Sequence, residues 1–562
     1  MPDRTSHLLL VLLVAAFASL ATHSLEQKSV TIDEYGFLPA AYNLVSTGDL
    51  RFSEWHTPLV NGLLGLPLIG ADVIPVNPPD GTPVEARYWF WNNGAWFAEA
   101  NGDRYHALLV RARLVSVLLG AALGVLAYLF ARQIAGPRAG AAGLVAAALT
   151  LFHPEVLAHS RLATLDVGLA FFFTLSLYTI QRYLKAPGAR RAALAGAALG
   201  LALASKFTSL LLIPAILAAV SLVARRPAGE HPFAEQTRGS CLGHLALFGL
   251  VALLVLHASY LFQEPTTGRD SISPRSEEMK SWQQHWPEWL QIPLPAQYVR
   301  AADRQLADQE RRYQGYLNGK TIRGGRPDYF LTLLLAKTPV AGVLLLLACS
   351  ALYVRHRAPR RLESFLLLAP ALLVAVAFSL SNKQLGLRMV LPVIPLVAIW
   401  MAAGSPILRA GRRWAVGAGA AVGLFILTSL WVHPHYLSYF NLASGGTDNG
   451  YRIGLGSNYD WGQDLPALAA WMERRGIDRV RLLYYGRIDP AIYGIDYVVP
   501  RRFAPGELPL VVSASHYGIR YPVPDHGVRR SFDIPARRGE IFESDRWRSE
   551  RIAPSLFVFE RR

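Results

Sequence analysis

Long apolar runs separated by short polar segments make up most of the first 432 residues. Each run approaches the length of about 20 residues that a helix needs to cross the hydrocarbon core of a bilayer. The runs lie at residues 7–23, 108–131, 139–153, 165–183, 192–205, 207–224, 241–262, 330–354, 363–381, 388–404 and 415–432. This pattern predicts an all-α polytopic membrane bundle of about 11 transmembrane helices.

The basic residues between the runs predict an orientation. One alternate set of short loops carries sixteen Lys and Arg residues, and the opposing set carries four. Cytoplasmic loops of membrane proteins are enriched in Lys and Arg. We therefore expect the N-terminus inside, the C-terminus outside and the chain in the cytoplasmic (inner) membrane. Residues 24–107, 263–329 and 433–562 then all lie on the outer face, periplasmic or extracellular.

Two interpretations of the first run stay open. A short apolar stretch that ends in small residues at 21–24 fits a cleaved signal peptide. The weak positive region before it, with Arg4 alone, favours a retained helix. Either interpretation leaves the chain from residue 24 onward outside.

The three outer segments have patterns of their own. Residues 35–45 and about 296–316 show amphipathic helical spacing, which predicts helices that lie along the membrane surface. Beyond residue 433 the apolar runs shorten to strand length, while 466–475 keeps a helical pattern. The strand-length runs are 480–485, 509–514 and 555–559. The sequence therefore predicts a transmembrane domain over 1–432 and a small extracytoplasmic α/β domain over 433–562.

Composition narrows the class of protein. Over 562 residues, 52% are hydrophobic, 17% are charged and the mean hydropathy is +0.25, which fits a membrane protein rather than a soluble one. The formal net charge of +16 does not indicate nucleic-acid binding, because the basic residues fall between apolar runs. Cys241 and Cys349 lie in or at the edge of such runs, so the sequence supports neither a disulfide framework nor a Cys/His metal motif.

The acidic pair Asp33 and Glu34 follows the first run closely, which holds two carboxylates near the membrane surface. A low-dielectric boundary disfavours the charged form of a carboxylate, and this suits it to act as a general base toward a hydroxyl group. A solvated acidic pair in a loop is the alternative interpretation.

Three more polar residues lie on the predicted outer face. His56 precedes an apolar helix that begins with proline, although a lone histidine is more often structural. Arg161 and Asp166 lie in the short segment between the third and fourth runs. They would either bind a substrate or pair with each other.

Three cations complete the set of candidates. Lys206, Lys383 and Arg388 lie at the predicted outer ends of apolar runs, where a desolvated charge needs an anion. A lipid phosphate fits that requirement, and snorkelling of each side chain to the headgroups is the alternative. Together with the acidic residues of the same face, they describe a site with a base and an anion clamp.

Several separate stretches resemble a known family. They are Asp33–Glu34, Gly48–Leu50, His56–Leu59, Arg161–Val167, Ser205–Thr208, Asp328–Phe330, Lys337–Pro339, Arg388 before Leu391–Leu396, Tyr439–Asn441 and Asp460–Asp464. In order and position they resemble the C-type (GT-C) membrane glycosyltransferases of the glycosyltransferase family 39 group. Relatives in that group include protein O-mannosyltransferases and lipid A aminoarabinose transferases. The resemblance extends over 30–470.

The resemblance implies an inverting transfer of a hexosyl or pentosyl group from a polyprenyl-phosphate carrier. The acceptor would be a protein, a lipid or a cell-envelope glycan at the outer membrane face. Asp33 would be the catalytic carboxylate, with Glu34 assisting it or orienting the acceptor. The residues that would line the same cavity or neutralise the donor phosphate are His56, Arg161, Asp166, Lys206, Lys383 and Arg388.

The chain departs from the aminoarabinose relatives at two places. Tyr35 and Gly36 follow the acidic pair where those relatives have a basic residue, and His56 stands in the region of a lysine. The substrate of those relatives is therefore not assigned to this chain.

A transporter or flippase of a lipid-linked sugar is the alternative function, because it would share the spans and the outer cations. Transporters usually place ionisable groups near mid-membrane, whereas these candidates cluster at outer helix ends. A non-catalytic scaffold would not need Asp33. We expect no required cofactor, and a divalent metal held by Asp33 and Asp166 stays open. The expected partners are the lipid-linked donor and membrane lipid, without nucleic acid.

Overall fold

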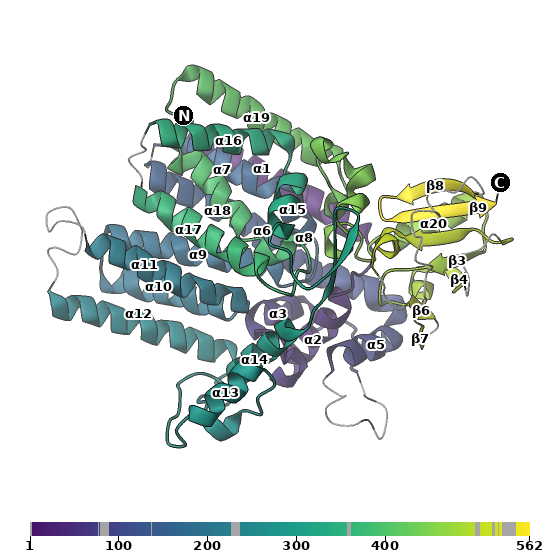
Figure 1. Cartoon of the computed structure of the whole chain (residues 1–562), viewed down its shortest axis with the longest axis horizontal. Helices are drawn as coiled ribbons and strands as arrows, with labels where there is room; N and C mark the ends of the chain where they lie inside the picture. Colours follow the sequence, from purple (N-terminus) through teal and green to yellow (C-terminus); the bar gives the residue numbers. More distant parts are fainter. Residues whose placement is uncertain are drawn as a thin grey trace.

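The computed structural model describes residues 3–76, 78, 82, 89–136, 138–225, 237–356, 361–500, 506–519, 523–525, 528–530 and 547–561. Helices form a bundle, and short strands form a sheet near the C-terminus (Figure 1). The N-terminus lies toward one end of the bundle, and the sheet lies at the other end (Figure 1).

Every predicted apolar run coincides with helical structure. The helices of the bundle are α1 (Asp3–Glu26), α6 (Tyr105–Ala135), α7 (Gly140–Leu151), α8 (Pro154–Ser160), α9 (Asp166–Lys185), α10 (Ala189–Leu203), α11 (Leu212–Ala224), α12 (Arg238–Ser259), α15 (Tyr329–Lys337), α16 (Val340–Arg355), α17 (Arg361–Ser379), α18 (Val393–Ile399) and α19 (Arg412–Trp431). Shorter turns adjoin some of them, namely η4 (Phe207–Leu211), η6 (Leu387–Val390) and η7 (Trp400–Gly404).

Five of the described helices are long and apolar enough to cross a membrane. The number rises to seven if two bent pairs, α7 with α8 and α15 with α16, each form one span. Other runs form shorter helices, since α10 and α11 have only 15 and 13 residues. The predicted class, a helical membrane bundle with a small C-terminal sheet domain, is confirmed. Length and composition alone account for five to seven of the roughly 11 expected spans.

Glycine allows close packing between two of these helices. A Cβ atom on Gly196 of α10 would lie 2.3 Å from the Phe248 carbonyl oxygen of α12, and one on Gly200 would lie 2.6 Å from that of Ala252. Small residues four apart let two helix backbones approach each other inside a membrane, where apolar side chains gain little by leaving lipid. The opposite side of α12 is open, with Leu250 65% exposed. That exposure suits contact with lipid.

The segment 24–107 folds beside the bundle as α2 (Glu34–Thr47), α3 (Pro58–Gly65) and α5 (Phe90–Ala100). The predicted surface helix over 35–45 corresponds to α2, but most of α2 is buried, including consecutive residues from Glu34 to Ala41. The prediction of a surface position was therefore wrong. Apolar and small residues occur all round this helix, so no polar face is left for water.

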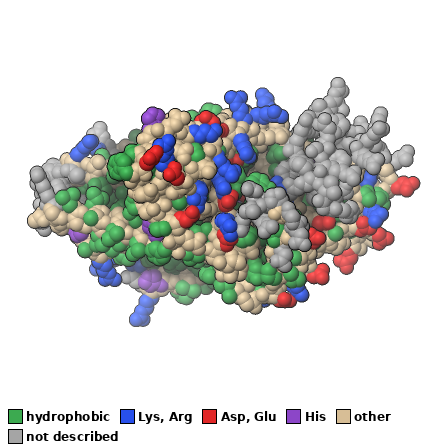
Figure 2. All heavy atoms as spheres, turned by 90° about the horizontal axis from the view of Figure 1, so that it is seen from below, with side chains coloured by type: hydrophobic (Ala, Val, Ile, Leu, Met, Phe, Trp, Pro, Cys, Tyr) green, Lys and Arg blue, Asp and Glu red, His purple; other side chains and the backbone are tan. Residues whose placement is uncertain are grey.

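The segment 263–329 forms α13 (Glu277–His285), α14 (Ala296–Glu310) and a hairpin of β1 (Gln314–Leu317) with β2 (Lys320–Arg323). The helix predicted over about 296–316 is confirmed for residues 296–310 as α14, whereas 314–316 belong to strand β1. Figure 2 shows charged side chains of both signs gathered near the middle of one molecular face, with hydrophobic side chains covering much of the surface beside them.

The C-terminal domain contains a mixed five-stranded sheet in the order β4-β3-β5-β9-β8. Its elements are α20 (Leu465–Arg475), β3 (Arg479–Leu483), β4 (Asp496–Val498), β5 (Leu510–Ser513), β8 (Trp547–Ala553) and β9 (Leu556–Arg561), beside a hairpin of β6 (Val523–Asp525) and β7 (Val528–Arg530). β3 runs parallel to β4 and β5, and β9 runs antiparallel to β5 and β8. The predicted strands and the helix over 466–475 are confirmed.

Single turns of 3₁₀ helix connect the larger elements. They are η1 (Leu50–Ser53), η2 (Leu66–Leu68), η3 (Gly102–Arg104), η5 (Arg269–Ser271), η8 (Tyr436–Ser438), η9 (Leu442–Ser444), η10 (Thr447–Arg452), η11 (Gly456–Asn458), η12 (Pro490–Tyr493) and η13 (Ala514–Tyr517). Four of them, η8 to η11, follow one another between α19 and α20, so the chain winds tightly where the sheet domain meets the bundle.

Candidate active site

A cavity of about 630 Å³ lies where the segments 24–107 and 263–329 meet the ends of bundle helices. Its walls combine side chains from the starts of α2 and α9, from within η4, α14 and η6, and from near the end of α17. Six of the eight predicted site residues line it, namely Asp33, His56, Asp166, Lys206, Lys383 and Arg388. Residues that are far apart in the sequence therefore share one chamber.

Arg388 stands between two carboxylates of the cavity. Its Nη1 atom lies 2.7 Å from Asp33 Oδ2 and 3.6 Å from Asp166 Oδ2. Lys206 Nζ lies 2.7 Å from Asp166 Oδ1. The Arg388 guanidinium also lies over the Trp461 ring, 4.4 Å from its centroid, where a cation is attracted to the face of the ring. Two acids and two cations thus form one continuous network.

Local chain geometry explains why these charges meet. Asp33 immediately precedes α2, and Asp166 is the first residue of α9. Lys206 precedes η4, and Arg388 lies within η6. Each charge therefore lies at or beside the start of a helix, where the partial positive charge of the helix N-terminus favours the two carboxylates.

Helix α14 supplies a further wall through a second ion pair. Lys383 contacts Asp308 of α14, and its Nζ lies 3.3 Å from the Gln305 side-chain oxygen. Burial, with the nearby charges of Lys383 and Lys206, lowers the pKa of His56 to about 3. His56 is thus a neutral imidazole at physiological pH, able to donate or accept a hydrogen bond but carrying no charge.

The remaining walls are apolar or aromatic. Residues at or beside the ends of bundle helices supply an aliphatic side, formed by Leu210, Leu211 and Ala377, with Phe378 next to it in the sequence. The segment before and within α5 and the turn before α3 supply an aromatic side, formed by Trp55, Trp89, Phe90 and Trp91. The cavity therefore offers an anion-binding region, an aliphatic region and flat aromatic rings within one volume.

Glu34 does not line this cavity, which corrects its predicted role beside Asp33. Both of its carboxylate oxygens face Arg113, whose Nε and Nη2 donate to them at 2.7 Å. The backbone N–H of Ala163 also donates to it at 2.7 Å, and both charged side chains are fully buried. Burial alone would raise the pKa of Glu34, but Arg113 outweighs that effect and the pKa is lowered. Glu34 is a structural anion that joins α2 to α6.

Arg161 is also outside the cavity lining, contrary to its predicted place. Its side chain is fully buried, and within the described residues none of its three side-chain nitrogen atoms has a hydrogen-bond partner. The alternative pairing of Arg161 with Asp166 is not observed, because Asp166 is engaged by Lys206 and Arg388.

A metal site was left open at Asp33 and Asp166. In the structure the Arg388 Nη1 atom lies between these two carboxylates. In the described part of the chain, no group of three or more His, Cys, Asp and Glu side chains is arranged to hold a metal ion. That no metal is required stays a prediction.

Four important residues were not predicted from the sequence. They are Lys28, Arg113, Asp308 and Trp461, each the direct partner of a predicted or neighbouring charge. Arg113 carried a usable signal, because it is a charge inside the predicted span 108–131 and such charges rarely lack a partner. Trp461 lies in the stretch Asp460–Asp464 that carries the family resemblance, but nothing in the sequence pairs it with Arg388. Asp308 carried no comparable signal, since only the fold brings it to the cavity.

Part of the chain matches a known family model. Residues 76–262, about a third of the chain, match the family described as dolichyl-phosphate-mannose-protein mannosyltransferase. The predicted resemblance to the GT-C membrane glycosyltransferases is confirmed. The matched part includes Asp166 and Lys206, whereas Asp33 and Arg388 lie outside it.

Three solved structures resemble the chain at low identity. ArnT from Cupriavidus metallidurans bound to undecaprenyl phosphate is 18% identical, with 86% of this chain and 74% of that chain covered and a TM-score of 0.47. The oligosaccharyltransferase of Archaeoglobus fulgidus is 14% identical, with 84% and 58% covered and a TM-score of 0.46. The S. cerevisiae Pmt1-Pmt2 complex is 21% identical, with 47% and 33% covered and a TM-score of 0.32. No curated protein matches the chain. Residue roles are therefore argued from the geometry of this chain.

Proposed function

We propose that the protein transfers a sugar from a polyprenyl-phosphate carrier to an acceptor at the outer face of the cytoplasmic membrane, with inversion at the sugar carbon. The observation that carries the proposal is the joining of Asp33 to the cations of one cavity, with an aliphatic wall beside them. A carboxylate, an anion clamp and a surface for a lipid chain are the three features that such a reaction needs. The family model that matches residues 76–262 also supports a lipid-linked sugar donor.

The proposed reaction is a single displacement. The acceptor hydroxyl oxygen attacks the sugar C1, the bond from C1 to the phosphate oxygen breaks, and its electron pair leaves with the polyprenyl phosphate. Asp33 takes the proton of the attacking hydroxyl group. Negative charge develops on the departing phosphate, where Lys206, Lys383 and Arg388 stabilise it, and the neutral His56 donates a hydrogen bond.

The contact between Asp33 and Arg388 gives the donor a role in preparing the base. In the structure Arg388 Nη1 binds Asp33 at 2.7 Å. A bound donor phosphate competes for the same guanidinium and draws it from the carboxylate. Asp33 is then free to accept a proton only when a donor is bound. The general base therefore becomes active only in the donor-bound site.

The proposal is tested with purified protein in lipid vesicles. Polyprenyl-phosphate-linked hexoses and pentoses are supplied with mixtures of protein, lipid and glycan acceptors, and mass spectrometry follows free polyprenyl phosphate and glycosylated product. We expect stoichiometric release of carrier and product, and product formation about 10³-fold slower with Asp33→Asn. Movement of intact lipid-linked sugar across the vesicle membrane without bond cleavage would contradict the proposal and favour a flippase.

A further inference from the structure

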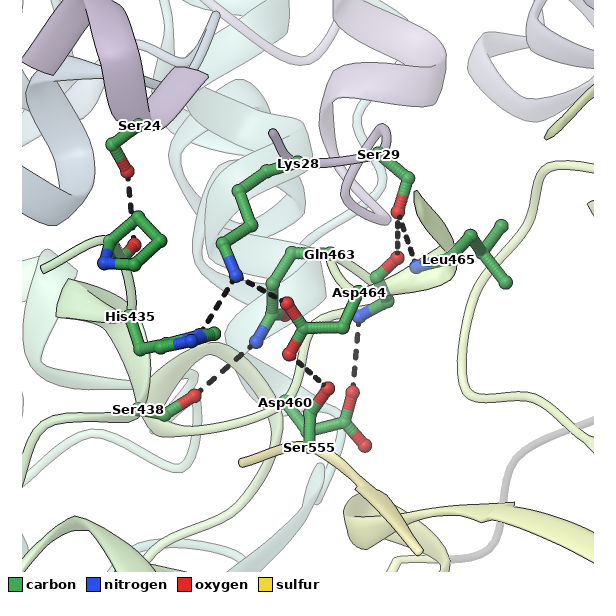
Figure 3. Close-up of polar contacts among 12 residues, drawn as sticks. Ser24, Lys28, Ser29, His435, Ser438, Asp460, Gln463, Asp464, Leu465 and Ser555 are labelled. Carbon is green, nitrogen blue, oxygen red and sulfur yellow. Dashed lines mark hydrogen bonds and ion pairs between the residues drawn. The ribbon is translucent and has the colours of Figure 1, made fainter. Parts of the chain in front are cut away.

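The segment that leads into Asp33 is bound by a turn from a distant part of the chain. We call residues 28–32 the entry segment and residues 460–464 the clamp turn; they lie side by side (Figure 3). The hydrogen bonds between them run from Ser29 N to Gln463 O (3.0 Å), from Ile32 N to Trp461 O (3.1 Å) and from the Ser29 hydroxyl to Gly462 O (2.8 Å). Asp33 follows the entry segment directly, so its position depends on these bonds.

A buried ion pair reinforces the same contact. Lys28 Nζ lies 2.5 Å from Asp464 Oδ1 and 2.9 Å from His435 Nδ1. The Ser555 hydroxyl donates to the other Asp464 oxygen at 2.5 Å (Figure 3). Burial alone would raise the pKa of Asp464, but Lys28 outweighs it and the pKa falls to about 2. Asp464 is therefore ionised, with both oxygens engaged, and a charge so enclosed is costly to leave without its partner.

The sheet of the C-terminal domain holds the clamp turn from its other side. The backbone N–H of Ser515 donates to Asp460 Oδ2, and the Tyr484 hydroxyl donates to the Gly462 carbonyl oxygen, each at 2.8 Å. Tyr484 and Ser515 follow the ends of the parallel strands β3 and β5. The carboxyl ends of parallel strands commonly hold a ligand. Here the clamp turn of the same chain occupies that edge.

The clamp turn makes two contacts beside the cavity. Its Trp461 ring supports the Arg388 guanidinium at 4.4 Å, and its backbone fixes Ile32, the residue before Asp33. One turn thus contacts both sides of the 2.7 Å pair between Asp33 and Arg388. The described contacts therefore couple the sheet domain to the geometry of the proposed base.

We propose that Asp464 and Ser555 are positioning residues, which hold Asp33 and Arg388 in place through the clamp turn and make the C-terminal domain part of the working site. This inference rests on the proposed transferase function. Neither residue lines the cavity, so their loss displaces Asp33 and Arg388 but leaves Lys206 and Lys383 in place to capture the donor.

The first experiment measures steady-state transfer by full-length Asp464→Asn. We expect kcat to fall about 10²-fold, the scale of a misplacement of about 1 Å at a reacting group. The KM for the lipid-linked donor should stay within about threefold, because Lys206 and Lys383 are untouched. A kcat close to that of the wild type would overturn the proposal.

A milder pair of variants guards against simple misfolding. Ser555→Ala removes one hydrogen bond to a carboxylate and should lower kcat about tenfold, whereas Ser555→Thr keeps the hydroxyl and should restore most of the rate. Ser549→Ala is the matched control, because Ser549 is exposed on the same β8–β9 hairpin. Equal effects at Ser555 and Ser549, or no rescue by threonine, would contradict a positioning role.

Hydrogen exchange provides a readout that needs no substrate. The Ser29 and Ile32 amides donate to the clamp turn, so both should lose protection in Asp464→Asn and Ser555→Ala while bundle amides keep theirs. Unchanged protection would overturn the inference. If wild-type protein transfers no sugar, the proposed function fails and exchange still tests the clamp. If wild type is active and both variants keep kcat, the positioning role alone fails.

Discussion

Asp33 and Glu34 are neighbours in the chain, yet the structure places them in two different charge networks. Asp33 faces the cavity and meets Arg388, with its side chain 22% exposed, whereas Glu34 is fully enclosed by Arg113 and backbone donors. The helix α2 begins between them. Successive residues at a helix start point in different directions, so a shared position in sequence did not give a shared role.

The two networks differ in what can replace a lost partner. In the cavity, water or a ligand phosphate can take the place of a side chain, so the pairs can be exchanged during a reaction. Neither Glu34 nor Arg113 is among the described residues that line the cavity, and removing either partner leaves an uncompensated buried charge. An open network of charges suits catalysis, and a closed one suits fixed architecture.

The largest expected effect comes from the open network. Asp33→Asn should lower turnover about 10³-fold, because the general base is lost. Thermal unfolding should change by about 1 kcal/mol or less, since the contact with Arg388 is only partly buried. Steady-state assays and unfolding in detergent measure the two quantities. Turnover close to that of the wild type in pure Asp33→Asn protein would contradict the role of Asp33 as the general base.

Replacing the next carboxylate, that of Glu34, by its amide should lower stability rather than turnover alone. Glu34→Gln leaves Arg113 buried without its carboxylate and should cost about 3–5 kcal/mol of stability. Reduced expression, a lower melting temperature and loss of donor binding should appear together. Asp33→Asn is the matched control. A stable Glu34→Gln protein with selective loss of turnover would instead place Glu34 in the reaction.

A smaller effect is expected on the affinity for polyprenyl phosphate, which should depend on the cations of the cavity and not on those of the surface. Lys206→Met should weaken binding of polyprenyl phosphate about tenfold, because one charge near the anion is lost. Lys320→Met is the control, since Lys320 is exposed on the β1–β2 hairpin. Titration of each variant in vesicles measures the affinity. If the two variants bind polyprenyl phosphate equally well, the donor phosphate does not bind beside Lys206.

A buried acid of the clamp turn should make the stability of the protein depend on pH, without a direct effect on the reacting groups. Burial raises the pKa of Asp460 to about 7, partly opposed by the backbone N–H groups of Ser515 and Gly462. The folded protein then keeps a proton that the unfolded chain releases above pH ~4, so stability falls as pH rises from about 4 to about 7 by up to ~1.4 kcal/mol per unit. Asp460→Asn should lack this slope. Melting temperatures of both proteins, measured from about pH 4 to about pH 7, test this. If the two proteins show the same dependence on pH, the prediction is wrong.

The fold was predictable where one physical signal dominated. Apolar runs of nearly membrane-spanning length located the bundle helices apart from α8, which lies in a segment between two runs, and the change to strand-length runs located β3, β5 and β9. The surface position of α2 was wrong, because a helix covered by α3 and α5 has the same local spacing as one lying on lipid. Only tertiary contacts separate these two cases.

The site was predictable as a group of residues on one face, but not as a set of pairings. The positions of Asp33, Asp166, Lys206, Lys383 and Arg388 relative to the apolar runs indicated a common location, and all five line the cavity. The direction of each side chain was not encoded in that pattern. Glu34 and Arg161 have similar positions relative to the apolar runs, yet they lie outside the cavity lining. Their position gave no indication of the partners Arg113 and Trp461.

The contact between Lys28 and Asp464, completed by Ser555, has a consequence for biosynthesis. Lys28 and Ser555 lie far apart in the sequence, so a ribosome makes everything between them before the three side chains can meet. The bundle helices are made and inserted before that moment. A growing or truncated chain can form the cavity walls but lacks the final contact that fixes the entry segment. The entry segment therefore reaches its final contacts only after synthesis has passed Ser555.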